Sequence, residues 1–498
     1  MSLAHAVHLA RPPGSSEPYR SLVLAGGGMR VAYQAGVLLA LEQAGVRFAH
    51  ADGTSGGTIN LAMLFSGSSP ADMCERWSSL TVGDFVSFLP AREYVKLEGP
   101  MAFGDADGII EHVFPHLGID VAKINAASGM EATFNVCNFT TKSNRAVSAS
   151  ELSLGLLVAG ISLPVVMPPV RVGDDYYVDS VWVKDANLTA AVERGAQEIW
   201  LVWCIGNTPQ YRSGPFNQYV HMIEISANAG LFAELAAIVD LNRRIARGDS
   251  PFGQREPITV KVIRPRYPLP LDPSYYLGAI DGHTLVALGY ADAAARLRRE
   301  AEPDALDDTA TRMLTPHEAV SFTEDWSGTL TWSTEASSAL QRLGHTLELR
   351  LGAFINNLPQ FMSDGSRSAQ LCGSLRIGQG PPAYLRDGQL RVHAEQDGLS
   401  LTYRAVAECA GTTVSVLAVR RIGVSGSVTL TLQDDSGAVL STTNPQRGAQ
   451  LHELVKTVKA VEPASPVEAL ETLNRFGSYC FGPIWRALRP KRCRWKFW

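Results

Sequence analysis

The sequence predicts an α/β domain with a mostly parallel sheet, followed by a smaller β-rich domain. Two units of strand, glycine turn and helix follow each other between residues 21 and 65. Strands and helices then alternate up to about residue 300, as in parallel sheets that carry helices on both faces. From Val320 onward, runs of Val, Leu and Thr separated by turn residues replace this alternation, which is typical of antiparallel strands.

The first domain begins with an apolar run, Ser21–Ala25, that ends in three glycines. Over Ala32–Ala44 the apolar residues Val37, Leu38 and Leu41 have helical spacing. The later elements expected in this domain are a strand at Val46–Ala51, a helix at Thr58–Phe65, a strand at Ala132–Asn138, a helix at Thr189–Gly195, a strand at Glu198–Cys204 and a surface helix over residues 231–245.

Chain length also favours two domains, because 498 residues is about twice the size at which a single core stops growing. We expect the boundary near Glu300–Asp308. In the second domain, Asp434–Gly437 is typical of a hairpin loop between strands of period two. The predicted parts are a leader at 1–18, the α/β domain at 19–300, a β-rich accessory domain at 301–484 and a basic and aromatic tail at 485–498.

Composition is that of a globular protein, with 46% apolar and 19% charged residues. The net charge of −5 gives no support to a nucleic-acid partner. The seven cysteines are scattered, which predicts neither a disulfide framework nor a zinc site. The first residues lack the basic and apolar regions of a secretory signal, and the uncharged stretch Leu152–Val170 is interrupted by three prolines. We therefore expect a cytoplasmic protein with no cofactor and no metal.

The strongest chemical motif is Gly53-Thr54-Ser55-Gly56-Gly57, between a predicted strand and a predicted helix. Glycines two residues on either side of a serine allow a tight strand-to-helix turn that exposes the hydroxyl. Ser55 would then lie at a helix N-terminus, where the helix dipole favours developing negative charge. An ordinary glycine-rich turn with a serine N-cap is the alternative interpretation.

A second glycine motif, Gly26-Gly27-Gly28-Met29-Arg30, follows the preceding strand. Successive glycines can expose adjacent backbone amides, which are the donors that an acyl-transfer oxyanion needs. The competing interpretation is a dinucleotide-binding turn with Asp52 on a ribose, but Val31 occupies the third glycine position. No Gly-Lys-Ser/Thr follows, so the motif is not a Walker A loop.

Together with Pro164, the segment Met167–Val170 and Tyr177-Val178-Asp179, these motifs resemble those of the patatin-like phospholipases over residues 19–300. The resemblance implies a three-layer α/β fold and a serine lipid acyl hydrolase, acting as a phospholipase, lipase or esterase through a Ser-Asp dyad and an acyl-enzyme. Carried over by position, Ser55 is the nucleophile and Asp179 the general base. The oxyanion-hole amides are those of Gly27, Gly28 and Met29, and the supporting motif residues are Gly26, Arg30, Gly53 and Gly57.

Two positions depart from the family pattern. Asp179-Ser180-Val181 stands where the family usually has Asp-Gly-Gly or Asp-Gly-Ala, and Asp185-Ala186-Asn187 stands in place of Asn-x-Pro. The alternative function is therefore a catalytically impaired patatin-fold protein that binds lipid or regulates. For an active dyad we expect partial burial to raise the Asp179 pKa, because an ordinary carboxylate is a weak base for a hydroxyl.

A Ser-His-Asp triad with His221 or His283 is the rival hydrolase interpretation, although neither histidine lies in a recognisable catalytic context. The partner expected from the resemblance is a phospholipid or another acyl-ester lipid. The tail from Trp485 to Trp498 combines six cations with four aromatic residues, a composition that favours peripheral contact with a membrane. A disordered tail, or one docked on its own protein, is the alternative.

Overall fold

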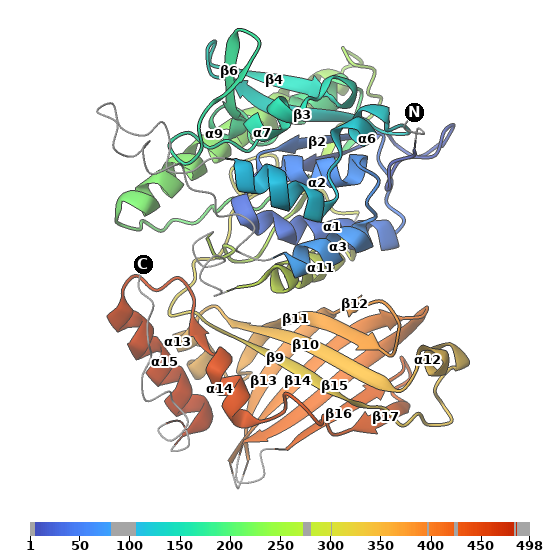
Figure 1. The fold of residues 1–498 in the computed structure, drawn as a ribbon, viewed down its shortest axis with the longest axis vertical. Helices are drawn as coiled ribbons and strands as arrows, with labels where there is room; N and C mark the ends of the chain where they lie inside the picture. Colours follow the sequence, from blue (N-terminus) through green and yellow to red (C-terminus); the bar gives the residue numbers. More distant parts are fainter. Residues whose placement is uncertain are drawn as a thin grey trace. The chain divides into compact units, whose positions relative to one another are not determined.

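The computed structural model describes residues 5–80, 106–271, 280–299, 301–395, 398–422, 427–482 and 485. The chain divides into two compact units, Met1–Thr315 and Pro316–Trp498. Figure 1 shows the α/β elements of the first unit and the long antiparallel strands of the second. The predicted fold class is confirmed: an α/β unit on a mostly parallel sheet precedes a separate β-rich unit.

The first unit is built on an eight-stranded sheet with the order β5-β6-β3-β2-β1-β7-β8, in which β4 pairs with β3. Strands β3, β2, β1, β7 and β8 pair in parallel, and β4, β5 and β6 join antiparallel at one side. The strands are β1 (Arg20–Leu24), β2 (His50–Thr54), β3 (Glu131–Asn138), β4 (Ser143–Ser148), β5 (Val170–Val172), β6 (Asp175–Asp179), β7 (Glu198–Val202) and β8 (Thr259–Ile263).

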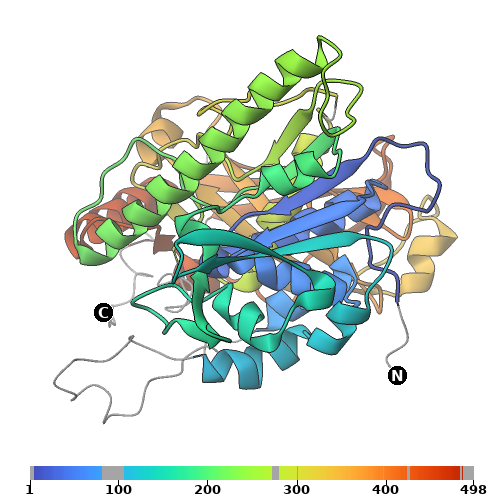
Figure 2. The same ribbon diagram turned by 90° about the horizontal axis from the view of Figure 1, so that it is seen from above.

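Helices pack on both faces of this sheet, as a buried parallel sheet requires. The helices of the unit include α1 (Ala32–Gln43), α2 (Gly56–Phe65), α3 (Pro70–Ser79), α5 (Phe114–Leu117), α6 (Val121–Ala126), α7 (Leu154–Ala159), α8 (Leu188–Glu193), α9 (Pro215–Ile245) and α11 (Gly282–Leu297). Figure 2 shows α9 as the long light-green helix of this unit. One core cluster joins α8 and α9 to Val23 of β1, Leu201 of β7 and Val260 of β8.

Helices α1 and α11 touch backbone to backbone. A Cβ atom on Gly36 would lie 1.9 Å from the carbonyl oxygen of Val286, and one on Gly289 would lie 1.9 Å from that of Tyr33. Both distances are far below van der Waals contact, so only glycine fits at these two positions. The contact joins the first long helix of the unit to its last described one.

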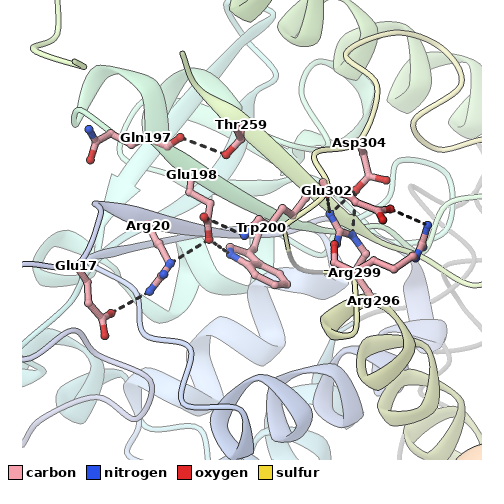
Figure 3. A network of polar contacts seen from close by, with 11 residues as sticks. Glu17, Arg20, Gln197, Glu198, Trp200, Thr259, Arg296, Arg299, Glu302 and Asp304 are labelled. Carbon is pink, nitrogen blue, oxygen red and sulfur yellow. Dashed lines mark hydrogen bonds and ion pairs between the residues drawn. The ribbon is translucent and has the colours of Figure 1, made fainter. Parts of the chain in front are cut away.

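A polar network lies at the amino ends of the central strands (Figure 3). Arg20 of β1 donates to Glu198 of β7 at 2.9 Å, and Lys261 of β8 lies 2.9 Å from the same carboxylate. Trp200 also donates to Glu198, from its indole nitrogen. These contacts link three neighbouring strands at the edge opposite to the glycine turns.

The second unit is a ten-stranded antiparallel sheet with the order β17-β16-β15-β14-β13-β11-β10-β9-β18, in which β12 pairs with β11. Its strands are β9 (Val320–Thr329), β10 (Thr346–Ile355), β11 (Ser368–Ile377), β12 (Ala383–Tyr384), β13 (Arg386–Glu395), β14 (Gly398–Cys409), β15 (Thr412–Ile422), β16 (Val428–Gln433), β17 (Val439–Thr443) and β18 (Lys459–Ala460). Its helices are α12 (Ser338–Leu343), α13 (Leu358–Ser363), α14 (Leu451–Thr457) and α15 (Pro466–Phe481). Asp434 Oδ1 accepts from the amides of Ser436 and Ala438 in the turn between β16 and β17.

The boundary between the units lies after Thr315, somewhat later than residue 300. The reason is visible in the contacts of the intervening stretch. Asp304 accepts a hydrogen bond from Arg296 (Figure 3) and another from the Val262 amide of β8. Thr311 donates to Asn228 of α9. Residues 301–315 thus pack with the first unit.

Of the tail predicted at 485–498, only Trp485 belongs to the described residues. Its ring stacks on Phe481 with centroids 5.7 Å apart, and it fills the space above Gly477, where a Cβ atom would lie 2.1 Å from the indole. The remaining tail residues lie outside the described part of the chain.

Candidate active site

Ser55 lies at the turn between β2 and α2, with φ 52° and ψ −131°. Positive φ is uncommon for a residue with a side chain and costs of order 1–3 kcal/mol. The hydroxyl of Ser55 makes no capping hydrogen bond to α2, and the residue is 6% exposed. The N-cap interpretation therefore does not account for this serine. The turn is a strained elbow that presents its hydroxyl away from the helix backbone.

Close contacts leave little or no room for a side chain at the glycines around Ser55. A Cβ atom on Gly57 would lie 2.1 Å from the carbonyl oxygen of Leu24 at the end of β1. A Cβ atom on Gly56 would lie 2.8 Å from the Gly28 carbonyl oxygen, and one on Gly53 would lie 3.1 Å from that of Gly57. The elbow is thus pressed directly against the neighbouring glycine turn.

The glycine turn follows β1, which pairs with β2 as expected, with Leu24 opposite Gly53. A Cβ atom on Gly26 would lie 3.3 Å from Ser55 Oγ, so the turn borders the hydroxyl. Arg30 holds this turn, since its Nε donates to the Gly27 carbonyl oxygen at 2.9 Å. The short 3-10 helix η1 (Gly28–Val31) begins with Gly28, whose φ is 58°. Met29, the next residue, is buried and takes part in a further interaction within the protein.

Two amides of the turn have no hydrogen-bond acceptor among the described residues. Within the described residues, the N–H groups of Gly27 and Gly28 donate no hydrogen bond. The peptide between these residues is planar and trans, so its N–H points opposite to its C=O. Since Arg30 holds the Gly27 carbonyl, it also fixes the direction of the Gly28 N–H. The turn that borders Ser55 thus keeps two backbone N–H groups without a partner among the described residues, and backbone N–H groups are the donors that an oxyanion needs.

Asp179 ends β6 and is fully buried. Its Oδ1 accepts from the Val181 amide at 2.9 Å. The Ser55 hydroxyl is close enough to this carboxylate to lower its pKa, although Oδ2 accepts no hydrogen bond of standard geometry from the described residues. Burial has the larger effect and raises the pKa of Asp179 to about 7. A buried carboxyl beside a serine hydroxyl, with one oxygen still free, can act as a general base near neutral pH.

The departure at Ser180 is accommodated by a network of asparagines that sequence reasoning missed. Ser180 Oγ donates to Asn144 Oδ1 at 2.5 Å, and Asn144 in turn donates to Asn135. Asn135 donates to Asp52 at 2.7 Å and to the Gly53 carbonyl oxygen at 3.2 Å. The network therefore joins the residue after Asp179 to the strand that carries the elbow. Asn135 lies inside the apolar run of β3, and this polar residue is the sequence feature from which a buried network could have been predicted.

Asp52 is a member of this network and not a ribose ligand. It is fully buried within β2 and accepts from Thr133 and Asn135. Burial raises its pKa to about 7, against the lowering effect of these hydrogen bonds. A dinucleotide-binding turn would need an exposed acidic group at this position to bind the ribose, and Asp52 is not exposed.

Neither rival histidine is placed as a triad base. Both ring nitrogens of His221 are occupied, one by Glu224 at 3.2 Å and the other by the Arg212 amide at 3.0 Å. His283 lies in the first turn of α11, the helix that packs on α1.

Asp185 stands where the family pattern has asparagine, and its side chain contacts the glycine turn. Both of its carboxyl oxygens accept from the Gly26 amide.

Among the described residues, no group of three or more His, Cys, Asp or Glu side chains could hold a metal ion. The six cysteines in the described part of the chain are buried and form no disulfide. The geometry around Ser55 supplies a hydroxyl, a buried carboxyl and backbone amides from the chain itself.

The comparison with protein families agrees with this geometry. Residues 22–192 match the family model of patatin-like phospholipase. The matched segment contains both glycine motifs, Ser55 and Asp179. No curated protein matches the chain with significant similarity. Residues 22–192 of the first unit are therefore similar to the patatin-like phospholipases, a family of lipid acyl hydrolases.

Proposed function

We propose that this domain is a serine hydrolase that cleaves acyl esters of lipids through a Ser55–Asp179 dyad and an acyl-enzyme. The observation that carries the proposal is the Ser55 elbow. A serine held at positive φ, with its hydroxyl unused by the helix and close to a buried carboxylate, has no structural role that explains its strain.

In the first half of the reaction, Ser55 Oγ attacks the acyl carbonyl carbon while Asp179 takes the hydroxyl proton. The carbonyl oxygen becomes an oxyanion that the Gly27 and Gly28 amides stabilise. Collapse of this intermediate breaks the ester bond, and the leaving alkoxide takes the proton from Asp179. The products of this half are an acyl-Ser55 ester and a free alcohol.

In the second half, water attacks the acyl-Ser55 carbonyl carbon and gives its proton to Asp179. The second oxyanion collapses, Ser55 Oγ leaves, and the proton returns from Asp179 to the serine. The net reaction consumes one water and releases one carboxylic acid, so the dyad ends in its starting state.

A lipid substrate fits the apolar surroundings of Asp179. The Ser162 carbonyl oxygen accepts from the Asp179 amide at 3.0 Å, and the loop that follows exposes Val165 and Val166. Tyr219 of α9 donates to the Pro164 carbonyl oxygen of the same loop at 2.8 Å. Large exposed apolar side chains near a site are typical of surfaces that meet apolar ligands.

Helix α9 extends this apolar surface. It is long and apolar enough to cross a membrane. Its 18-residue apolar stretch has a mean hydropathy of 1.5, but only 28% of this stretch is buried. Met222 and Ile225 are among its exposed side chains. Because its other face packs in the domain core, we assign α9 to the domain and propose peripheral membrane contact of a cytoplasmic protein. The tail anchor at 485–498 stays a prediction.

The test of the proposed function compares the wild type with Ser55→Ala on two substrates, a p-nitrophenyl butyrate solution and phosphatidylcholine vesicles. Wild type should release p-nitrophenol and fatty acid, and Ser55→Ala should lose at least about 10³-fold in kcat. Ser66→Ala, at the end of α2, is a matched control that should keep wild-type rates. Equal rates in wild type and Ser55→Ala would favour the impaired lipid-binding alternative.

A further inference from the structure

Asp185 lies in the turn between the 3-10 helix η5 (Ser180–Trp182) and α8, and its carboxyl group is buried against the glycine turn. Its two oxygens accept from the Gly26 N–H at 3.1 and 3.2 Å. A Cβ atom on Gly26 would lie 2.4 Å from Asp185 Oδ1 and 2.8 Å from Ser55 Cβ. Gly26 is therefore enclosed between the Asp185 carboxyl and the nucleophile.

The Ala25–Gly26 peptide is held at both of its polar atoms. Its carbonyl oxygen accepts from Gln34 Nε2 at 2.7 Å, and its N–H is the group bound by Asp185. The Gly27–Gly28 peptide is held through its carbonyl oxygen, which accepts from Arg30. Two of the three peptides are thus fixed by side chains, and the N–H groups of Gly27 and Gly28 are the donors that remain.

The charged and titratable groups that face Asp185 come from four parts of the fold. Asp179 and Asp52 lie on β6 and β2, Arg30 lies in η1, and Cys204 follows β7. Burial raises the pKa of Asp185 to about 8, and the Asp179 carboxylate adds to the rise. The Gly26 amide and Arg30 oppose it. The raised pKa favours the uncharged acid near neutral pH, and in that form one of the two oxygens that lie next to the Gly26 N–H can still accept from it.

We propose that Asp185 is a positioning residue, which holds the glycine turn against Ser55 and must be uncharged for the oxyanion to form. The inference rests on the proposed function, because it assigns Asp185 a part in the same reaction. A second carboxylate beside Gly26 repels the negative charge that develops on the substrate oxygen. The rate should consequently fall when Asp185 ionises.

The test is the pH profile of kcat/KM between pH 5 and 10 on a soluble short-chain p-nitrophenyl ester. Wild type should give a bell with an alkaline limb near pH 8. Asp185→Asn keeps an oxygen that accepts from Gly26 but cannot ionise, so its alkaline limb should disappear while the acid limb stays. Asp185→Ala removes the acceptor too, and its kcat should fall at least about tenfold at every pH.

Asp292→Asn is the matched control. Asp292 of α11 is another buried carboxyl whose pKa burial raises to about 7, and it accepts from Tyr33 at 3.0 Å. This variant makes the same chemical change without touching the glycine turn, so it should keep the wild-type bell. A bell lost in both variants, or kept in both, would overturn the role of Asp185.

Thermal unfolding supplies a second readout that does not depend on catalysis. A carboxyl with a raised pKa binds its proton more tightly in the folded state, so its folded state loses stability as pH rises from about 4 to 8. Asp185→Asn lacks this loss, and its Tm relative to wild type should increase over that range. A constant difference would contradict the assignment. An inactive wild type would overturn the proposed function and this role together, whereas an active wild type with unchanged profiles overturns the role alone.

Discussion

A buried ion pair of the second unit differs from the buried carboxyls around Ser55 in the first unit. In the second unit, Glu324 and Arg420 form an ion pair, and Tyr403 and Trp326 also donate to Glu324. In the first unit, Glu234 pairs with Lys184, but the buried carboxyls of Asp52, Asp179 and Asp185 near Ser55 make no ion pair within the described residues. Burial is the main cause of their raised pKa values. A buried ion pair fixes the arrangement of the side chains around it. A buried carboxyl without a cationic partner can have its pKa raised toward neutral pH, and it can then take up and release protons there.

Removing the proposed base, Asp179, should have the largest effect. Asp179→Asn cannot accept the Ser55 proton, so kcat should fall by about 10²- to 10⁴-fold. The rate of ester hydrolysis at saturating substrate measures this. Circular dichroism should show an unchanged fold, because the amide is nearly isosteric with the acid. Activity within threefold of wild type would remove Asp179 from the reaction.

Breaking the ion pair of the second unit should affect stability and leave the chemistry of the first unit intact. Arg420→Met leaves Glu324 buried without its cation, and the free energy of unfolding of this unit should fall by about 3–5 kcal/mol. Urea denaturation, followed by hydrogen exchange of β9 and β15 peptides, measures the loss. The double variant Glu324→Gln/Arg420→Met should recover much of it. An Arg420→Met protein as stable as wild type would show that the pair is not needed.

The pH dependence of the reaction should reflect the unpaired carboxyls. Because the pKa of Asp179 is about 7, the ionised base becomes available as pH rises, and kcat/KM should increase tenfold per pH unit below that value. The sign for stability is opposite: the folded state holds this proton from about pH 4 to 7, so ionisation destabilises it. Rates at pH 5, 6 and 7 decide the matter, and an acid limb near pH 4 would contradict a raised pKa.

Restoring the family residue after Asp179 should have the smallest effect. Ser180→Gly removes the hydrogen bond to Asn144, which should cost about 0.5–1.5 kcal/mol of stability and change kcat less than threefold. Thermal unfolding and the standard esterase assay measure both. A large gain in rate would mean that the serine impairs wild-type catalysis, as the lipid-binding alternative supposes.

The features predicted correctly from the sequence are those encoded locally. A strand, a glycine turn and a helix lie within a few residues of each other, so the parallel sheet and the Ser55 elbow follow from neighbouring residues. The β hairpin at Asp434 has the same local origin. Ser55, Asp179 and the glycines were assigned from ordered motifs, and their roles stay predictions that the variants above test.

The remaining features depend on partners far away in the chain. Asp185 lies 159 residues from Gly26 in the sequence, and Asn135 lies 83 residues from Asp52. No local sequence pattern predicts either contact. The stretch 301–315 likewise has no helix or strand of its own, and its place in the first unit is decided by Asp304 and Thr311. Long-range hydrogen bonds of this kind are not visible in a single sequence.

The central position of β1 has a consequence for how the protein is made. This strand lies between β2 and β7, so the glycine turn that follows it gains its second neighbour only after residues 198–202 have left the ribosome. Helix α11, which contacts α1 through Gly36 and Gly289, emerges later still. Within the first unit, the surroundings of β1 are thus completed late in synthesis, and a fragment ending at residue 192 lacks the strands β7 and β8 and the helix α11.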